Sequence, residues 1–416
     1  MTPVTGGERP SGDLIYDWND GQGTSPDAAP SAVMLDDETL RDGLQSPSAV
    51  DPPVEAKREL LHLMDALGID TADVGLPGAG PRAAADVEVL CREIAASRLR
   101  IRANCAARTV LQDVEPILRI SQQTGLEIEA CLFIGSSPIR QYAEGWDEEF
   151  LVRQSAEAIR YAVASGLPVM FVTEDTARAR PETVRRLYAE AVRLGVRRVC
   201  VTDTVGHATP AGARRLVRFV RESIDEAGGR AVGIDWHGHR DRGLGLANSL
   251  AAYSAGATRV HGCALGIGER CGNTEIDLLL VNLKLLGWID RDLTRLGEYC
   301  RTASRALGLP IPSNYPVVGA DAFETATGVH AAAVIKAYRK GEAWLADRIY
   351  SGVAAADFGF RQRIRVGPMS GRSNVIHWLE EHGFEPTAER VDRIFDAAKQ
   401  ASGLLEEAQL HRLAAE

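Results

Sequence analysis

Eight short runs rich in Val, Ile and Leu recur along the chain, and a longer amphipathic stretch separates each run from the next. The runs lie at 33–37, 71–75, 99–105, 127–134, 168–173, 196–202, 232–237 and 258–266. This alternation is typical of βα units built around a parallel sheet. Eight units over roughly 250 residues favour a barrel, although a doubly wound open sheet is the alternative. We therefore predict an α/β fold, a (β/α)8 TIM barrel.

The composition changes at both ends of the barrel pattern. Residues 1–30 are rich in Gly, Pro, Ser, Asp and Thr, which favours a flexible N-terminal arm. The strand pattern fades after residue 285, and helical patterns such as 292–308 and 373–383 replace it. We predict a TIM-barrel catalytic domain over 31–290 and an appended, mainly helical C-terminal region over 291–416.

Charge and cysteine content exclude several classes of protein. The 416 residues carry a formal net charge of −10 without a notable basic patch, so we expect no nucleic-acid partner. No apolar run reaches the ~18 residues of a transmembrane helix, and the N-terminus lacks a basic-then-apolar signal pattern. The seven scattered cysteines contain no CxxC and indicate reduced thiols. We therefore expect a cytoplasmic protein without a membrane partner.

Polar residues follow the first and seventh runs, where a parallel barrel carries its catalytic groups. Arg41 and Asp42 come after the first run, and the seventh ends on His237 and His239. Alternate residues of a strand point to the same side, so both imidazoles can face one point. Because the first and seventh runs flank the eighth in a closed barrel, Asp42 can complete a site for a divalent metal such as Mg, Mn, Zn or Co. The alternative is that one histidine is a neutral core residue.

The other strand ends carry groups that suit a small anion. Asn273 closes a glycine-bearing loop after the eighth run and is expected to add an oxygen ligand or to orient one, although a plain turn is the alternative. Hydroxyl and guanidinium donors that converge on one mouth can bind a carboxylate. These candidates follow the fourth, fifth and sixth runs, and each hydroxyl is alternatively a helix N-cap: Ser137, Arg140, Thr173 and Thr204.

Three segments carry a resemblance to a known family. The segment 37–43 resembles the DxTLR[DE]G signature of the 2-isopropylmalate synthase and homocitrate synthase family, and 203–210 and 237–273 resemble two further blocks. That family comprises metal-dependent barrel enzymes related to hydroxymethylglutaryl-CoA lyase. The resemblance implies a Claisen condensation of an acyl-CoA, usually acetyl-CoA, with a 2-oxo acid bound to a divalent metal. It also implies a homodimer.

The resemblance also suggests roles for individual residues. Arg41 would stabilise the developing oxyanion, worth on the order of 3 kcal/mol by analogy with oxyanion-hole donors. Glu174, at the end of the fifth run, is the second expected catalytic residue of the barrel. Thr204 would bind the substrate carboxylate. The C-terminal region would supply His330 and Tyr350 to the acyl-CoA side of the site, with Tyr338 as the alternative tyrosine.

Three positions near the expected substrate deserve comparison with the family pattern. Gln45 keeps the family glutamine and is expected to contact the substrate. Asp73 stands where the family usually has Glu near the catalytic arginine. Arg140 stands where many isopropylmalate synthases have His, which favours an acidic acceptor if its guanidinium pairs with a second anionic group. Alternatively, Arg140 is a surface residue at a helix start.

Two other functions are compatible with these motifs. One is the reverse chemistry, a hydroxymethylglutaryl-CoA-type lyase, although the loop 268–271 follows the synthase pattern. The other is a catalytically silent, metal-binding paralogue, which the presence of Arg41, Asp42, His237 and His239 disfavours.

Overall fold

The computed structural model describes residues 14–16, 19, 30 and 32–416. Most of the arm expected over residues 1–30 therefore lies outside the described residues. The chain divides into two compact units, with the division between Pro310 and Ile311. Residues 291–310 thus belong to the same compact unit as the barrel. The domain boundary at residue 290 comes from the sequence and stays a prediction. Along the described residues, no helix has the length and apolar content needed to cross a membrane.

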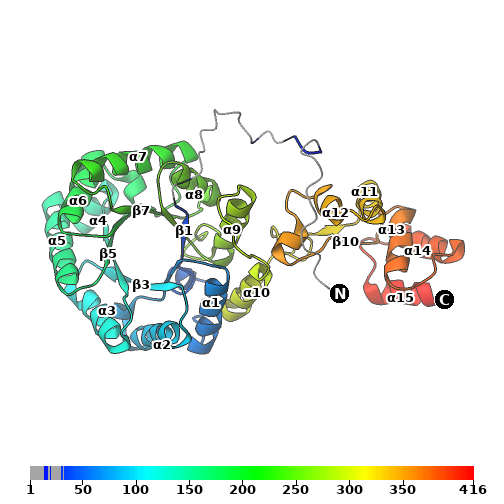
Figure 1. Cartoon of the computed structure of the whole chain (residues 1–416), viewed down its shortest axis with the longest axis horizontal. Helices are drawn as coiled ribbons and strands as arrows, with labels where there is room; N and C mark the ends of the chain where they lie inside the picture. Colours follow the sequence, from blue (N-terminus) through cyan, green and yellow to red (C-terminus); the bar gives the residue numbers. More distant parts are fainter. Residues whose placement is uncertain (1–13, 17–18, 20–29, 31) are drawn as a thin grey trace. The chain divides into compact units, whose positions relative to one another are not determined.

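The first unit is a closed barrel of eight parallel strands, which confirms the predicted TIM-barrel class. Each strand pairs with the next, and β1 pairs with β8 to close the ring. Figure 1 looks into this ring, which the helices surround. The strands are β1 (Met34–Asp37), β2 (Thr71–Asp73), β3 (Arg102–Arg108), β4 (Glu129–Gly135), β5 (Val169–Glu174), β6 (Arg198–Asp203), β7 (Gly233–Gly238) and β8 (Arg259–Gly262).

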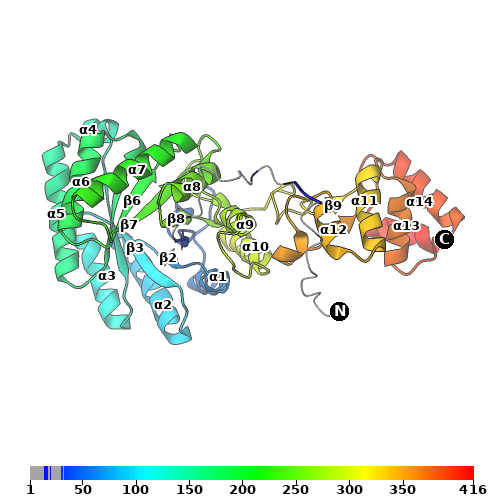
Figure 2. The same ribbon diagram turned by 45° about the horizontal axis from the view of Figure 1, so that its top comes forward.

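The helices of the barrel unit cover the outside of the strands (Figure 2). Their buried residues recur at helical spacing; in α1, for example, Leu60, Leu61 and Met64 are fully buried. These helices are α1 (Val54–Ala66), α2 (Pro81–Ser97), α3 (Leu111–Thr124), α4 (Pro138–Glu144), α5 (Glu148–Ala164), α6 (Pro181–Arg193), α7 (Pro210–Glu226), α8 (Gly245–Ser254), α9 (Ile276–Leu285) and α10 (Leu296–Leu307).

The interior of the barrel is unusually polar. The Asn104 amide in β3 donates to Asp36 in β1 at 2.7 Å, and Arg259 in β8 contacts Glu129 in β4 at 2.5 Å. Neither pair joins strands that are neighbours in the sheet. The contacts therefore span the lumen, where branched apolar residues usually dominate.

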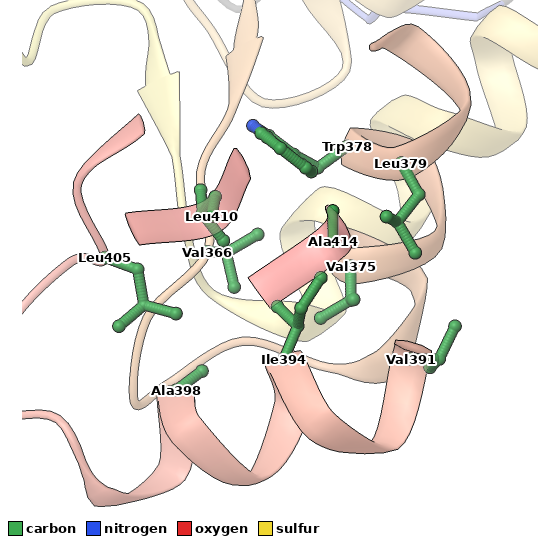
Figure 3. Close-up of a cluster of buried hydrophobic side chains, with 10 residues drawn as sticks. All are labelled: Val366, Val375, Trp378, Leu379, Val391, Ile394, Ala398, Leu405, Leu410 and Ala414. Carbon is green, nitrogen blue, oxygen red and sulfur yellow. The ribbon is translucent and has the colours of Figure 1, made fainter. Parts of the chain in front are cut away.

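The second unit is mainly helical, as the sequence predicts. It contains α11 (Gly328–Arg339), α12 (Ala343–Arg348), α13 (Arg372–Glu381), α14 (Ala388–Gln400) and α15 (Glu407–Ala415). Two strands, β9 (Glu324–Thr325) and β10 (Arg363–Ile364), form a small parallel sheet. Figure 3 shows the core of this unit, where Trp378 and Leu379 of α13, Ile394 of α14 and Leu410 of α15 are buried together.

Candidate active site

A cavity of about 300 Å³ opens at the carboxyl ends of the barrel strands. Its lining combines charged groups with an apolar wall. The charged and polar lining residues are Glu38, Arg41, Asp42, Gln45, Glu174, Thr202, Thr204, His237, His239, His261 and Glu269. The remaining lining residues are Ala106, Cys131, Phe133, Met170, Val172 and Cys200. A concave site with a few convergent polar groups is the usual form of a small-molecule site.

The structure brings the three predicted metal ligands together at this cavity. Asp42, His237 and His239 each offer a ligand atom, and these atoms lie within 4.8 Å of one another. The Asp42 Oδ2 atom is 3.8 Å from His237 Nε2 and 3.5 Å from His239 Nε2. Two histidines and a carboxylate with open positions suit a divalent transition metal.

The atoms around this group also fit a metal. Asn273 donates from its amide nitrogen to Asp42 Oδ2 at 2.7 Å, while its buried Oδ1 has no hydrogen-bond partner among the described residues. Burial, and then the neighbouring His237, lower the pKa of His239 to about 4. His239 is therefore neutral at pH 7, which is the state that binds a metal. Asn273 thus keeps a buried oxygen that no described residue uses.

The guanidinium of Arg41 lies beside this group and is held by three carboxylates. Its Nε contacts Asp73 at 2.7 Å, and its two terminal nitrogens contact Asp42 at 3.0 Å and Glu38 at 2.9 Å. These contacts fix the plane of the guanidinium, which still lines the cavity. Asp73 does not line the cavity; it positions Arg41 from behind.

Three other predicted residues line the same cavity: Gln45, Glu174 and Thr204. Burial raises the pKa of Glu174, which makes this carboxylate a stronger proton acceptor than an exposed one. The Thr204 hydroxyl accepts the backbone N–H of Asp175 at 2.9 Å and lies 3.2 Å from the hydroxyl of Thr202. Sequence reasoning missed Thr202, although it lies at the end of β6, two residues before Thr204.

Besides Asp73, which was also expected among the substrate-binding residues, three predicted substrate contacts lie outside the cavity lining. Thr173 is buried towards the helices, with its hydroxyl 2.7 Å from those of Thr176 and Tyr188. Ser137 is the N-cap of α4, which is the alternative that the sequence left open. Arg140 pairs with Glu144 at 2.9 Å and with Glu174 at 3.6 Å. Their expected substrate contacts stay predictions.

The two residues expected on the acyl-CoA side belong to the C-terminal unit. The rings of His330 and Tyr350 lie against each other, with centroids 4.3 Å apart. The alternative tyrosine, Tyr338, stacks instead on His377 at 6.0 Å. His330 therefore lies beside Tyr350, and the role expected for both in the reaction stays a prediction.

Glu38 and His261 line the cavity without having been expected there. Glu38 lies inside the 37–43 motif, and His261 follows Arg259 on the same face of β8. Burial opposes the charge of His261, but the carboxylates of Glu38 and Asp36 outweigh it and raise its pKa to about 10. The sequence signal that could have identified these two residues is the alternation of polar residues along a buried strand.

Comparison with known proteins shows that the chain is similar in sequence and fold to a family of barrel enzymes. Residues 32–302 match the HMGL-like family model. The chain is 34% identical to homocitrate synthase AksA of Methanopyrus kandleri, over 89% of this chain and 88% of that protein. It is 28% identical to (R)-citramalate synthase CimA of Methanocaldococcus jannaschii, over 89% of this chain and 71% of that protein.

The solved structures agree at the level of the fold. The hydroxymethylglutaryl-CoA lyase of Pseudomonas aeruginosa superposes with a TM-score of 0.54 at 22% identity, over 67% of this chain and 93% of that one. The family model spans the barrel and its strand-end motifs, and the homocitrate synthase matches most of both chains. The chain belongs to the HMGL-like family.

Proposed function

We propose that the protein condenses an acyl-CoA, in the first place acetyl-CoA, with a 2-oxo acid; a carbon–carbon bond forms at the ketone, and water cleaves the thioester to release CoA and a 2-hydroxy acid of the alkylmalate or homocitrate type. The observation that carries this proposal is the group of Asp42, His237 and His239 beside Arg41, at one cavity. The relatives named homocitrate, isopropylmalate and citramalate synthase support the same reaction class.

The chemistry divides among residues that line the cavity. A divalent metal held by Asp42, His237, His239 and Asn273 would chelate the oxo acid and polarise its ketone. Arg41 donates hydrogen bonds where negative charge develops on the ketone oxygen. Glu174 takes the α-proton of the acyl group: Glu38 and Asp42 pair with Arg41 and histidines at the metal group, whereas the Glu174 carboxylate has, among the described residues, only the 3.6 Å contact with Arg140, and burial outweighs this contact and raises its pKa.

Two hydroxyls and the apolar wall select the acceptor. The Thr204 hydroxyl, which donates to Thr202 at 3.2 Å, can turn to donate to the carboxylate of the acceptor, while Thr202 donates to the carbonyl of Thr173 at 2.6 Å and lines the cavity beside it. The wall of Ala106, Cys131, Met170 and other apolar side chains suits a short aliphatic side chain on the oxo acid. We therefore propose an aliphatic acceptor in place of the acidic one that the sequence favoured.

A panel assay tests the proposal. The purified protein, loaded with Mg²⁺, Mn²⁺, Zn²⁺ or Co²⁺, is mixed with acetyl-CoA and either 2-oxobutyrate, 2-oxoisovalerate or 2-oxoglutarate, while a thiol reagent reports free CoA. We expect CoA release with an aliphatic acceptor and a condensed diacid by mass spectrometry. Cleavage of hydroxymethylglutaryl-CoA without any condensation would favour the lyase. Metal binding with neither activity would favour a silent paralogue.

Location and assembly complete the proposal. We propose a homodimer, as the family resemblance implies, and a cytoplasmic location, as the scattered cysteines indicate. Sedimentation at micromolar concentration tests the dimer, and fractionation of the source cells tests the location. A monomer that retains full condensation activity would contradict the first point.

A further inference from the structure

A line of buried charged side chains runs inside the barrel and ends at the proposed metal ligands. At its far end, the Arg259 guanidinium contacts Asp235 Oδ2 at 2.5 Å. The same Asp235 oxygen is 2.8 Å from His261 Nε2, and His261 Nδ1 is 3.0 Å from Glu38 Oε1. These four residues are 3% exposed or less.

Glu38 connects this line to two parts of the active site. Its Oε1 atom accepts from the Arg41 guanidinium at 2.9 Å, and its Oε2 atom is 2.7 Å from His237 Nδ1. A carboxylate at Nδ1 holds a histidine in the tautomer that leaves Nε2 free for a metal. His237 Nε2 is the nitrogen that faces Asp42. One carboxylate thus orients a metal ligand and the proposed oxyanion donor.

His261 in turn holds Glu38. Both of its ring nitrogens face carboxylates, Glu38 on one side and Asp235 on the other. Asp235 cannot follow a displaced imidazole, because Arg198 and Arg259 hold its two oxygens. Buried ion pairs contribute little net stability compared with apolar packing, so the fold alone gives no reason for this line. The need to orient the side chains of the active site does give a reason for it.

We propose that His261 is a positioning residue that fixes Glu38, and through it His237 and Arg41. Its effect on the metal site follows from geometry alone, and its effect on turnover rests on the proposed function. Loss of His261 leaves Arg41 as the remaining partner of Glu38 Oε1, so the Glu38 carboxylate can shift away from His237 Nδ1 and the tautomer of His237 is less firmly fixed. Removing the carboxylate partner of a ligating histidine typically weakens metal binding by about 10- to 100-fold, and we expect its displacement to act in the same way.

The test is titration of the metal-free full-length protein with Mn²⁺ alone. The concentration of free Mn²⁺ is measured from its electron paramagnetic resonance signal. We expect His261→Leu to raise the Mn²⁺ dissociation constant by about 10- to 100-fold, and His261→Gln, which keeps one donor, to raise it less. Tyr253→Phe is the control, because it deletes a buried hydrogen bond to the backbone of Met34 away from the cavity. Unchanged affinity in folded His261→Leu, or an equal loss in the control, would overturn the proposal.

A second variant keeps the test decisive if His261→Leu does not fold. Glu38→Gln retains the shape of the side chain and is expected to weaken Mn²⁺ binding to a similar extent. In the Glu38→Gln background, His261→Gln should add little, because both act through one contact chain; full additivity would overturn the proposal. When the His261 and Glu38 variants are assayed with both substrates, we expect their kcat to fall while their KM for acetyl-CoA stays constant. Weakened metal binding with no condensation by the wild-type protein would instead refute only the proposed function.

Discussion

Replacing Arg41 by lysine separates its proposed catalytic role from its structural one. The guanidinium contacts three buried carboxylates, at 2.7 to 3.0 Å, and a lysine ammonium cannot reproduce this fork. Loss of one oxyanion donor costs about 3 kcal/mol of transition-state stabilisation, and each ~1.4 kcal/mol is a factor of ten in rate. We expect kcat for CoA release to fall about 100- to 1000-fold in Arg41→Lys.

Arg291→Lys is the matched control for this experiment. The Arg291 side chain is 18% exposed, against 19% for Arg41, and it pairs with Asp70 at 2.9 Å without lining the cavity. Both variants should lose stability in thermal unfolding, but only Arg41→Lys should lose kcat. Full kcat in a folded, metal-loaded Arg41→Lys protein would refute the role of Arg41, and so would an equal loss of kcat in Arg291→Lys.

Three further predictions follow from the same contacts. A divalent metal at 100 times its dissociation constant should stabilise the fold by about 2.7 kcal/mol, and His239→Ala should abolish this gain in thermal melts with and without a chelator. Arg140→Ala should leave the ratio of aliphatic to dicarboxylic acceptor turnover unchanged; a shift of the ratio would show that Arg140 reaches the substrate. Because folding raises the pKa of His261 from 6.5 to about 10, its stabilising contribution is complete below pH 6.5 and is lost as the pH rises towards 10. The difference in unfolding free energy between wild type and His261→Leu should therefore shrink over that range in urea titrations, and a constant difference would contradict it.

The residues at strand ends could be predicted because a barrel forces the ends of its strands to converge. His237 lies in β7 and His239 directly follows the strand, so the two-residue period of an extended chain alone places both on one side. The same rule limits prediction where the register is unknown. Thr173 and Glu174 are adjacent in β5, so they point to opposite faces, and only the structure identifies Glu174 as the one that lines the cavity.

The charged line inside the barrel could not be predicted in the same way. Each strand appears in the sequence as an apolar run. Asp235 and Arg259 are isolated charged residues within two of these runs. Their pairing depends on which side chains meet in the lumen, which is a property of the closed ring. The small sheet of the C-terminal unit was not predicted for a different reason: each of its strands has only two residues.

The charge of the cavity lining gives an independent argument about the acceptor. Four carboxylates line it, those of Glu38, Asp42, Glu174 and Glu269, and Arg41 and the protonated His261 offset two of them. A divalent cation brings the lining close to neutral, and an acceptor with one carboxylate then adds a single negative charge beside Thr204. A dicarboxylic acceptor adds a second charge that lacks a partner, because Arg140 already pairs with Glu144 and Glu174. Charge and the apolar wall thus favour the same acceptor, and faster turnover of 2-oxoglutarate than of 2-oxobutyrate would show that Arg140 leaves its carboxylates when substrate binds.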